Sequence, residues 1–356
     1  MRTRGICIFL SLLMLGSVLI FTPSAEQSNI THEIPLIPAF ELNEAQETAL
    51  ADTGFGRGAT ANWSASGGSE GRDFIYEIVE DSGGNIIIAG SVYVDCWLGS
   101  IVVQTEGLGD IIVAKLDPDG NWLWAKSAGT AIAYDEARGV ALDDDDDIYI
   151  TGYLNGTVTF GSNQLISDKF DGYIAKLNGT NGNWEYAIKY GGFDVDVGWD
   201  IAVDSAENVY VTGYYQNISS FGIYNLNGGT PSEDYRFFIA KYNHSTPDWE
   251  WAFTGIGDGL SVGFQLVLDA SENVYIVGYN TGSVTWNNNF TSSTSGTYNG
   301  FLLKYSSSGS FQWGRAIGAA SGCFGTNCGV YFNNVVIDSQ QRVVVGGNQL
   351  GDVTYA

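Results

Sequence analysis

Histidine, basic residues and long apolar runs are scarce in this chain of 356 residues, and each scarcity removes a class of function. The only histidines are His32 and His244, which excludes most zinc sites and histidine-based catalytic triads. Lysine and arginine together number 15 against 40 aspartates and glutamates, so the formal charge is −25. Phosphate binding needs a basic surface, so nucleic acid is not an expected partner. No run after residue 25 is apolar enough to span a membrane.

Proline is rare, with 6 residues, whereas glycine is abundant, with 47. So many glycines favour tight turns over long helices. Hydrophobic residues make up 44% of the chain and aromatic residues 13%, which is enough to bury a core. No G-x-x-x-x-G-K-[ST] loop is present to cradle a phosphate, and we expect no cofactor.

The first 25 residues are typical of a secretory signal peptide. Arg2 and Arg4 form a basic start, residues 6–21 form an apolar run, and Ser24-Ala25 provides a small pair for cleavage. The run is short for a hydrocarbon core of about 30 Å, so cleavage is favoured over an uncleaved membrane anchor. We therefore expect a protein that is secreted or displayed at the cell surface.

Residues 26–60 differ in character from the rest of the chain. They contain Pro35, Pro38, scattered acids and closely spaced glycines, and only residues 41–50 would suit a short helix. We predict a linker over residues 26–60 and a repeat domain over residues 61–356.

A repeat of about 60 residues dominates the chain from residue 61 onward. Apolar runs end in glycines that are 62, 61, 65 and 69 residues apart, at Gly90, Gly152, Gly213, Gly278 and Gly347. Four of the seven lysines occupy one further repeat position, at Lys115, Lys176, Lys241 and Lys304. So regular a spacing indicates tandem copies of one structural unit.

Each unit contains four short β-type runs bounded by Asp, Asn and Gly turns. In the second unit these runs are residues 136–142, 148–152, 172–177 and 184–188. Tandem units of four antiparallel strands, without helical periodicity, are the blades of a β-propeller. The sequence therefore predicts an all-β propeller with four complete blades and partial blades at both ends.

Three motifs link the repeat to a known family. They are Asp204-x-x-x-Asn-Val-Tyr-Val-Thr-Gly213, Asp171-Gly-Tyr-Ile-Ala-Lys-Leu177 and Gly182-Asn-Trp184. Together they resemble the SBBP-type β-propeller repeat of secreted microbial proteins over residues 61–356. The resemblance implies the fold but no particular activity, because the family's members lack a common assigned one. The departures are Arg236 and Asn299 in place of the acid at Asp110 and Asp171, and Arg342 in place of the turn asparagine.

The blade count leaves two interpretations open. The segment around Trp63 matches only the last strand of a unit, and the final unit supplies two strands before Ala356. In one interpretation the N-terminal strand completes the C-terminal blade and closes a five-bladed ring. In the other the chain is truncated at the C-terminus and belongs to a longer propeller, which the missing third strand favours.

Strand alternation assigns the connections to two faces. Short, similar turns lie on one face, and long, varied connections between second and third strands lie on the other. We expect a specific ligand on the varied face, although the sequence assigns no individual binding residue there. The varied connections are residues 91–109, 153–170, 214–235 and 279–299.

No catalytic or metal-binding residue is predicted. The acidic run Asp143–Asp147 has the oxygen ligands that Ca²⁺ prefers, but aspartates at the same turn of other units indicate hairpin closure. His244 lies in a turn where the repeat places no acid or nucleophile beside it. Four acids without a repeat explanation, Asp95, Glu106, Asp194 and Asp196, would suit a glycosidase if two met at the propeller axis.

Aromatic residues of the varied connections have two interpretations. They would stack on sugar rings if exposed, but their recurrence at unit positions favours packing between blades. The residues are Tyr93, Trp97, Tyr153, Tyr214, Tyr215, Tyr279 and Trp286.

The cysteines fit an exported protein. Cys323 and Cys328 are five residues apart in an insertion before the last partial blade, and we predict a local disulfide between them. Cys96 is left over, which suggests a free thiol, an intermolecular bridge or a partner in sequence missing from this chain.

These patterns favour a secreted or cell-surface propeller that acts as a non-enzymatic binding scaffold for an extracellular protein or glycan. Two alternatives remain: a carbohydrate-binding or glycoside-hydrolysing propeller with axial carboxylates, and a structural array within a larger adhesin. Two acids about 5 to 10 Å apart at the axis would support hydrolysis. An axis filled by apolar side chains would argue against it.

Overall fold

The structure is a computed structural model that describes residues 65–227, 235–293, 298–318 and 329–350. It also describes one short strand pair, β1 (Leu13–Met14) with β2 (Ser17–Val18). The remainder of the predicted signal peptide and linker, and both Cys323 and Cys328, lie outside the described residues. In the described ranges no helix is long and apolar enough to cross a membrane.

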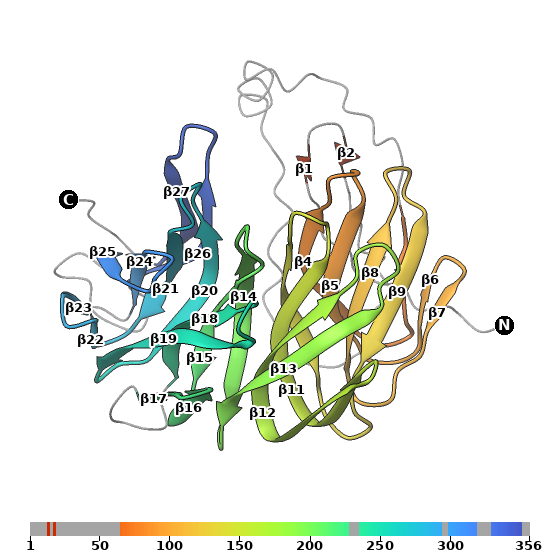
Figure 1. The fold of residues 1–356 in the computed structure, drawn as a ribbon, viewed down its shortest axis with the longest axis horizontal. Helices are drawn as coiled ribbons and strands as arrows, with labels where there is room; N and C mark the ends of the chain where they lie inside the picture. Colours follow the sequence, from red (N-terminus) through yellow and green to blue (C-terminus); the bar gives the residue numbers. More distant parts are fainter. Residues whose placement is uncertain are drawn as a thin grey trace.

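Four antiparallel units of four strands follow one another along the chain, and the strands of each unit pair in sequence order (Figure 1). The first blade consists of β4 (Asp73–Glu80), β5 (Ile86–Val92), β8 (Asp110–Leu116) and β9 (Trp122–Ala128). The second consists of β10 (Glu136–Leu142), β11 (Ile148–Phe160), β12 (Asn163–Leu177) and β13 (Trp184–Gly192). The third consists of β14 (Asp196–Val203), β15 (Val209–Tyr215), β18 (Arg236–Asn243) and β19 (Asp248–Gly257). The fourth consists of β20 (Ser261–Leu268), β21 (Val274–Asn280), β24 (Asn299–Tyr305) and β25 (Phe311–Ile317).

A fifth, partial blade follows as the pair β26 (Gly329–Ile337) and β27 (Val343–Leu350). The predicted all-β architecture with four complete blades is therefore confirmed.

The varied connections, predicted as loops, are largely hairpins. They contain β6 (Cys96–Leu98) with β7 (Ile101–Val103), β16 (Ile218–Phe221) with β17 (Tyr224–Asn227), and β22 (Ser283–Trp286) with β23 (Phe290–Ser293). In the second blade β11 and β12 themselves continue into the hairpin. The loop prediction is wrong there, because each hairpin buries apolar side chains such as Phe221 and Trp286 and so gains a place in the core.

Two of these hairpins join successive blades. β16 pairs with β13 of the preceding blade, and β22 pairs with β19 in the same way. The short strand β3 (Gly67–Gly68) pairs with β6 of the first blade's hairpin. β3 thus takes the place that β13 and β19 occupy elsewhere, as predicted for the last strand of a unit.

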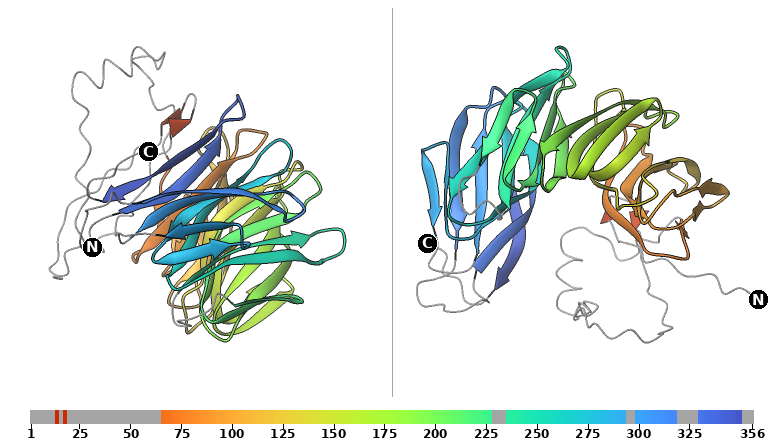
Figure 2. Two further views of the ribbon diagram at one scale, coloured as in Figure 1. Left: turned by 90° about the vertical axis from the view of Figure 1, so that its left-hand side faces the viewer. Right: turned by 90° about the horizontal axis from the view of Figure 1, so that it is seen from below.

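The blades lie along an arc with their first strands at the inner edge. Each first strand contacts the next one in the series β4, β10, β14, β20 and β26. Seen from below, the first blade and the β26–β27 pair lie at opposite ends of an open arc (Figure 2). β26 and β27 form a two-stranded sheet among the described residues, which do not close into a ring.

The hydrophobic core is divided among the spaces between neighbouring blades. One cluster joins the first and second blades, a second joins the second and third, and a third joins the third and fourth. The second and third strands of each blade are buried on both faces, as their continuous apolar runs predict. The core therefore holds adjacent blades together rather than filling a single centre.

The closing glycines face an irregularity in the neighbouring strand. Every first strand contains a β-bulge opposite the closing glycine, for example between Ile75 and Glu77 opposite Gly90. A side chain at Gly90 or Gly213 would collide with the carbonyl oxygen of Phe74 or Val197, respectively. Glycine is required at these positions because two backbones approach closely.

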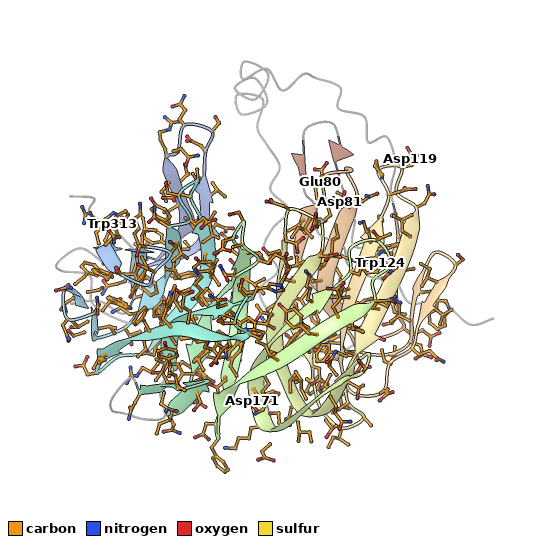
Figure 3. All side chains as sticks on the ribbon, in the orientation of Figure 1. Glu80, Asp81, Asp119, Trp124, Asp171 and Trp313 are labelled. Atoms are coloured by element: carbon orange, nitrogen blue, oxygen red, sulfur yellow. The ribbon has the colours of Figure 1, made fainter. Side chains whose placement is uncertain are left out.

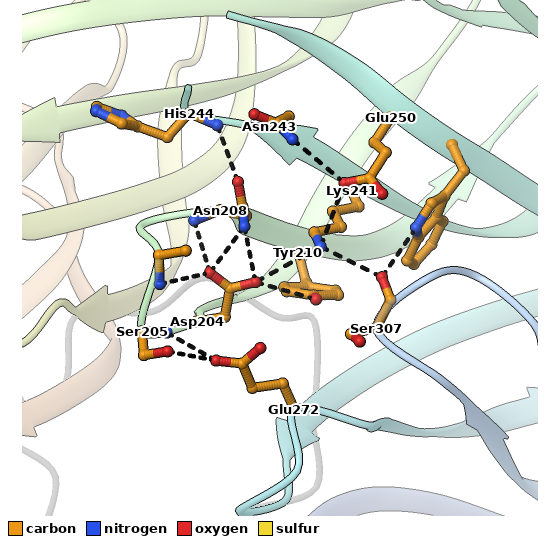
Figure 4. A network of polar contacts seen from close by, with 12 residues as sticks. Asp204, Ser205, Asn208, Tyr210, Lys241, Asn243, His244, Glu250, Glu272 and Ser307 are labelled. Carbon is orange, nitrogen blue, oxygen red and sulfur yellow. Dashed lines mark hydrogen bonds and ion pairs between the residues drawn. The ribbon is translucent and has the colours of Figure 1, made fainter. Parts of the chain in front are cut away.

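The repeated lysines are explained by ion pairs to the repeated turn aspartates. The Nζ to carboxylate-oxygen distance is 2.7 Å for Lys115–Asp81, 3.2 Å for Lys176–Asp143, 3.6 Å for Lys241–Asp204 and 3.3 Å for Lys304–Asp269. Around Asp204 the same carboxylate also accepts hydrogen bonds from the backbone and side chain of Asn208 and from the Tyr210 hydroxyl (Figure 4). These charges hold the turns in place.

The two faces of the arc carry different connections. Figure 3 places Asp81 and Asp119 at one end of the first blade, where the short turns lie, and Asp171 at the opposite end of the second blade. We call these the turn face and the loop face. On the turn face, the Ser82 amide donates to Asp146 of the next blade at 2.9 Å and the Ser205 hydroxyl donates to Glu272 at 2.5 Å.

Candidate functional site

Four side chains at the inner edge of the arc form a continuous row, which we call the axial ladder. It consists of Tyr76, Arg138, Trp199 and Phe264, each of which is the extra residue of the bulge in its first strand. The Arg138 Cζ lies 4.2 Å from the centroid of the Tyr76 ring and 4.8 Å from that of Trp199. The ring centroids of Trp199 and Phe264 are 5.1 Å apart. A bulge re-aims its side chain, so these four residues face one another across blades.

A buried carboxylate holds the guanidinium of the axial ladder. The Arg138 Nη2 lies 2.6 Å from Glu136 Oε2, and the Glu136 side chain is 6% exposed. Burial alone would lower the pKa of Arg138, but the charge of Glu136 raises it. Arg138 is therefore a fixed cation with aromatic rings on two sides, which favours cation–π attraction.

A second row of aromatic residues borders the ladder. Tyr153, Tyr214 and Tyr279 are half-buried, and their rings contact those of Phe170, Tyr235 and Tyr298 at centroid distances of 5.1, 4.7 and 5.4 Å. Burial and the neighbouring Tyr235 raise the pKa of Tyr214 to about 12, so its hydroxyl stays neutral.

The other aromatic candidates divide between core and surface. Tyr215 and Trp286 are fully buried, which confirms the packing interpretation for them. Trp97 is 49% exposed on the outer hairpin, and Tyr93 contacts Tyr134 at 5.6 Å.

The acids of the inner strands serve blade-to-blade contacts. Glu77 Oε2 accepts the Val140 amide at 2.6 Å, and Asp200 Oδ2 accepts the Leu266 amide at 2.8 Å. In the fourth blade Gln265 makes the equivalent bond to Val335 at 2.6 Å. Since a neutral glutamine takes the same place, these carboxylates act as structural acceptors. Burial and the charge of Asp200 raise the pKa of the half-buried Glu77, so the inner edge of the described arc holds two interacting carboxylates beside the rings and the guanidinium.

Two of the acids without a repeat explanation line one cavity. Asp95 and Glu106 border a cavity of about 410 Å³ on the loop face, between the first and second blades, together with Asp110. We call this cavity the junction pocket. Asp95 Oδ1 accepts the Thr105 amide at 3.0 Å, and Asp110 Oδ2 accepts the Glu106 amide at 2.7 Å. Three carboxylates therefore line the pocket. Two come from the connection at residues 91–109, and the third, Asp110, begins β8.

The other two acids lie at the next blade junction. Asp194 pairs with Lys169 at 2.6 Å, and Asp196 Oδ2 accepts the Gly192 amide at 2.8 Å. Asp196 has a repeat explanation that the sequence did not reveal, because it stands three residues before the bulge, as do Asp73 and Asp135. The four acids are thus divided between two sites.

The remaining polar candidates take part in turns. Asp143 and Asp147 both pair with Lys176 at 3.2 Å, which supports hairpin closure for the acidic run. The expectation that no acid stands beside His244 is wrong, because Glu207 of the neighbouring turn lies 3.7 Å from its Nε2. Within the described ranges no group of three histidines, cysteines, aspartates or glutamates is arranged to hold a metal ion. Cys96 is buried in β6.

The ladder residues escaped the sequence interpretation because their chemical types differ. Tyr76, Arg138, Trp199 and Phe264 are 62, 61 and 65 residues apart, the same spacing as the closing glycines. That spacing is the signal that identifies them. Similarity of residue type does not reveal all of them, because three are aromatic and Arg138 is not.

Sequence similarity to a repeat-containing protein agrees with a repeat, β-rich fold. No protein-family model matches the chain. An uncharacterized WD repeat-containing protein of Acanthamoeba polyphaga mimivirus is 27% identical over an alignment of 234 residues, which covers 55% of this chain and 17% of that protein. The extracellular domain of a hybrid two-component system from B. thetaiotaomicron aligns over 78% of this chain and 37% of that chain, with 14% identity and a TM-score of 0.31. The SBBP-type family stays a resemblance.

Two buried aspartates at the blade junctions, Asp135 and Asp196, predict an unusual dependence of stability on pH. Burial, with the Asp110 charge, raises the pKa of Asp135 to about 7, and burial, with the Asp171 charge, raises that of Asp196 to about 7. A raised folded-state pKa means that the native state binds protons more readily than the unfolded state, whose aspartates titrate near about 3.9. The free energy of unfolding should therefore rise as the pH falls from 8 to 5.

Below about pH 4 the trend should reverse. Burial would raise the pKa of Asp269, but hydrogen bonds from Asn273 and Lys304 lower it to about 2, so its contribution is lost as the pH falls toward 2. Urea unfolding from pH 2 to 8 measures both limbs. Asp196→Asn should make the free energy of unfolding depend less steeply on pH between 5 and 8. Asp269→Asn should reduce the dependence on pH at the acidic end in the same way. Stability that rises from pH 5 to 8 would contradict this account.

Proposed function

We propose that this protein is a non-enzymatic binding scaffold whose axial ladder binds a polypeptide partner. The observation that carries the proposal is the row of half-buried rings that flank the fixed guanidinium of Arg138. Tryptophan, tyrosine and arginine are the residues that dominate the energetics of protein interfaces. They bind through large contact areas with little loss of side-chain freedom.

The ladder also has the rigidity that a binding surface needs. Each of its side chains starts from a strand backbone rather than from a loop, and Arg138 is held by Glu136. A preorganised surface loses less entropy when it binds. The similarity to a WD repeat-containing protein supports a repeat scaffold, and the acidic composition supports solubility.

We also propose export from the cytoplasm. Support comes from the basic start and apolar run of residues 1–25 and from the closely spaced Cys323 and Cys328, which suit an oxidising compartment. The disulfide between these two cysteines stays a prediction.

The test of binding is selection of random 12-residue peptides on the full chain, followed by affinity measurement with variants. Trp199→Ala and Arg138→Ala should each weaken the selected peptides by at least about tenfold, because each removes a central contact. Trp97→Ala is the matched control, since Trp97 is exposed on an outer hairpin, and it should leave the affinity unchanged.

Two results would overturn the binding proposal. Selected peptides that bind Trp199→Ala as tightly as the unmodified chain would place binding elsewhere. Glycans from an array that bind in a Trp199-dependent manner, while no peptide does, would identify a carbohydrate-binding protein instead.

Export is tested with a reporter. Alkaline phosphatase that lacks its own leader should become active outside the bacterial cytoplasm when fused behind residues 1–25. Leu15→Arg should abolish this activity, because a charge interrupts the apolar run. A fusion that stays inactive while it accumulates in the cytoplasm would refute export.

A further inference from the structure

The junction pocket is lined by Asp110, the first residue of the third strand in its blade. The charges around this position differ from those around the equivalent positions of the other blades. Asp110 pairs with the end of the second strand of its blade. At the same register position the following blades carry Asp171, Arg236 and Asn299. Two residues further along the third strand, the partner on the fourth strand is Ser127 in the first blade and then Lys189, Thr254 and Ala316.

The next two blades supply a cation of their own. In the second blade the Lys189 ammonium binds Asp171, whose side chain is 2% exposed. In the third blade the cation is Arg236 itself, which is buried and donates to the carbonyl oxygen of Gly259. In the fourth blade the equivalent residues, Asn299 and Ala316, are both neutral. None of these three blades leaves a carboxylate at this position without a cation.

The first blade has the acid without the cation. Asp110 is 1% exposed, and its Oδ1 has no hydrogen-bond partner among the described residues. Ser127 stands where Lys189 would be, and its hydroxyl donates instead to the Gln104 carbonyl at 3.0 Å. Asp95 and Glu106 add two more carboxylates, and no lysine, arginine or histidine lines the pocket.

The absence of a side chain at Gly129 keeps the space beside Asp110 open. Gly129 borders the pocket, and any side chain there would collide with Asp110 Oδ1. The hydroxyls of Thr157 and Thr159, from the second blade, complete the lining. A buried carboxylate that lacks a counter-charge is costly, so a cation that enters this space gains a large electrostatic interaction.

We propose that the junction pocket binds a primary ammonium group, carried by a lysine side chain of a partner polypeptide or by a free alkylamine. An ammonium has three hydrogen-bond donors, which match the carboxylates and hydroxyls of the lining. It would take the place that the Lys189 ammonium takes in the next blade. A divalent metal is a poorer match, because the described residues hold no cluster of three suitable ligands.

Calorimetry on the full chain tests the proposal with three probes. Nα-acetyl-lysine N-methylamide should bind at least tenfold more tightly than its Nε-acetylated counterpart, which has the same shape without the charge. The third probe, n-butylammonium, separates the two sources. If n-butylammonium binds as tightly as the lysine derivative, the natural ligand is a free alkylamine. If it binds more weakly, the natural ligand is a lysine side chain of a polypeptide. Either result supports ammonium binding in the junction pocket.

Variants assign the binding to Asp110. Asp110→Asn should weaken the lysine probe at least tenfold, and the fold accommodates asparagine because Asn299 occupies the same place in the fourth blade. Ser127→Lys should abolish binding and raise the melting temperature, because the introduced ammonium pairs with Asp110 as Lys189 pairs with Asp171. Ser127→Met fills the same space without charge, so it should block binding without raising the melting temperature.

Several outcomes would overturn the proposal. They are equal binding of the Nε-acetylated probe, unchanged binding by Asp110→Asn, and Asp110-dependent binding of Ca²⁺ with none of ammonium. Trp199→Ala should leave ammonium binding unchanged, since Trp199 is not among the residues that line the pocket. Failure of the axial ladder as a binding surface is therefore distinguishable from failure of the pocket.

Discussion

Each blade depends on the close approach of its second strand to the bulge in its first strand. The closing glycine makes this approach possible, because any side chain at Gly152 would collide with the carbonyl oxygen of Glu136. The bulge in turn directs one residue of the first strand toward the inner edge of the arc. The spacing of the closing glycines along the chain therefore sets the spacing of the axial-ladder residues. The close backbone packing at each glycine thus determines which side chains form the surface at the inner edge.

The junctions between blades combine apolar packing with bonds from side chains to backbone. Glu77, Asp200 and Gln265 each accept an amide of the next first strand, and the clusters between sheets bury large aromatic residues such as Tyr149 and Phe238. Because these features recur, a junction that departs from the pattern stands out. The acid Asp110, with Ser127 at the fourth-strand position where the second blade has Lys189, is such a departure, and it coincides with a cavity. Repetition thus provides the internal reference against which a functional exception is recognised.

Much of the fold follows from the sequence, because strand ends and turns carry characteristic residues. The glycine series, the lysine series and the Asp-closed hairpins predict the blades. In the second unit β10 covers residues 136–142 as expected, whereas β11, β12 and β13 extend beyond the predicted 148–152, 172–177 and 184–188. The hairpins of the varied connections were missed, because their strands are short: Ser283–Trp286 and the similar run at residues 157–160 are only four residues long. The axial ladder was missed because its residues share a backbone geometry, whereas Arg138 interrupts the aromatic series. The junction pocket depends on contacts between blades, which no local pattern encodes.

The central claim is that the bulge opposite the closing glycine positions the axial ladder. Fluorine NMR of the 5-fluorotryptophan-labelled chain tests it directly, with the Trp199 resonance assigned by Trp199→Phe. Gly213→Ala should shift this resonance, because the new methyl group collides with the backbone beside the Trp199 bulge. Gly346→Ala, where a methyl group makes only ordinary contact with Asn334, should leave it in place. A Trp199 resonance unchanged in a folded Gly213→Ala variant would contradict the account.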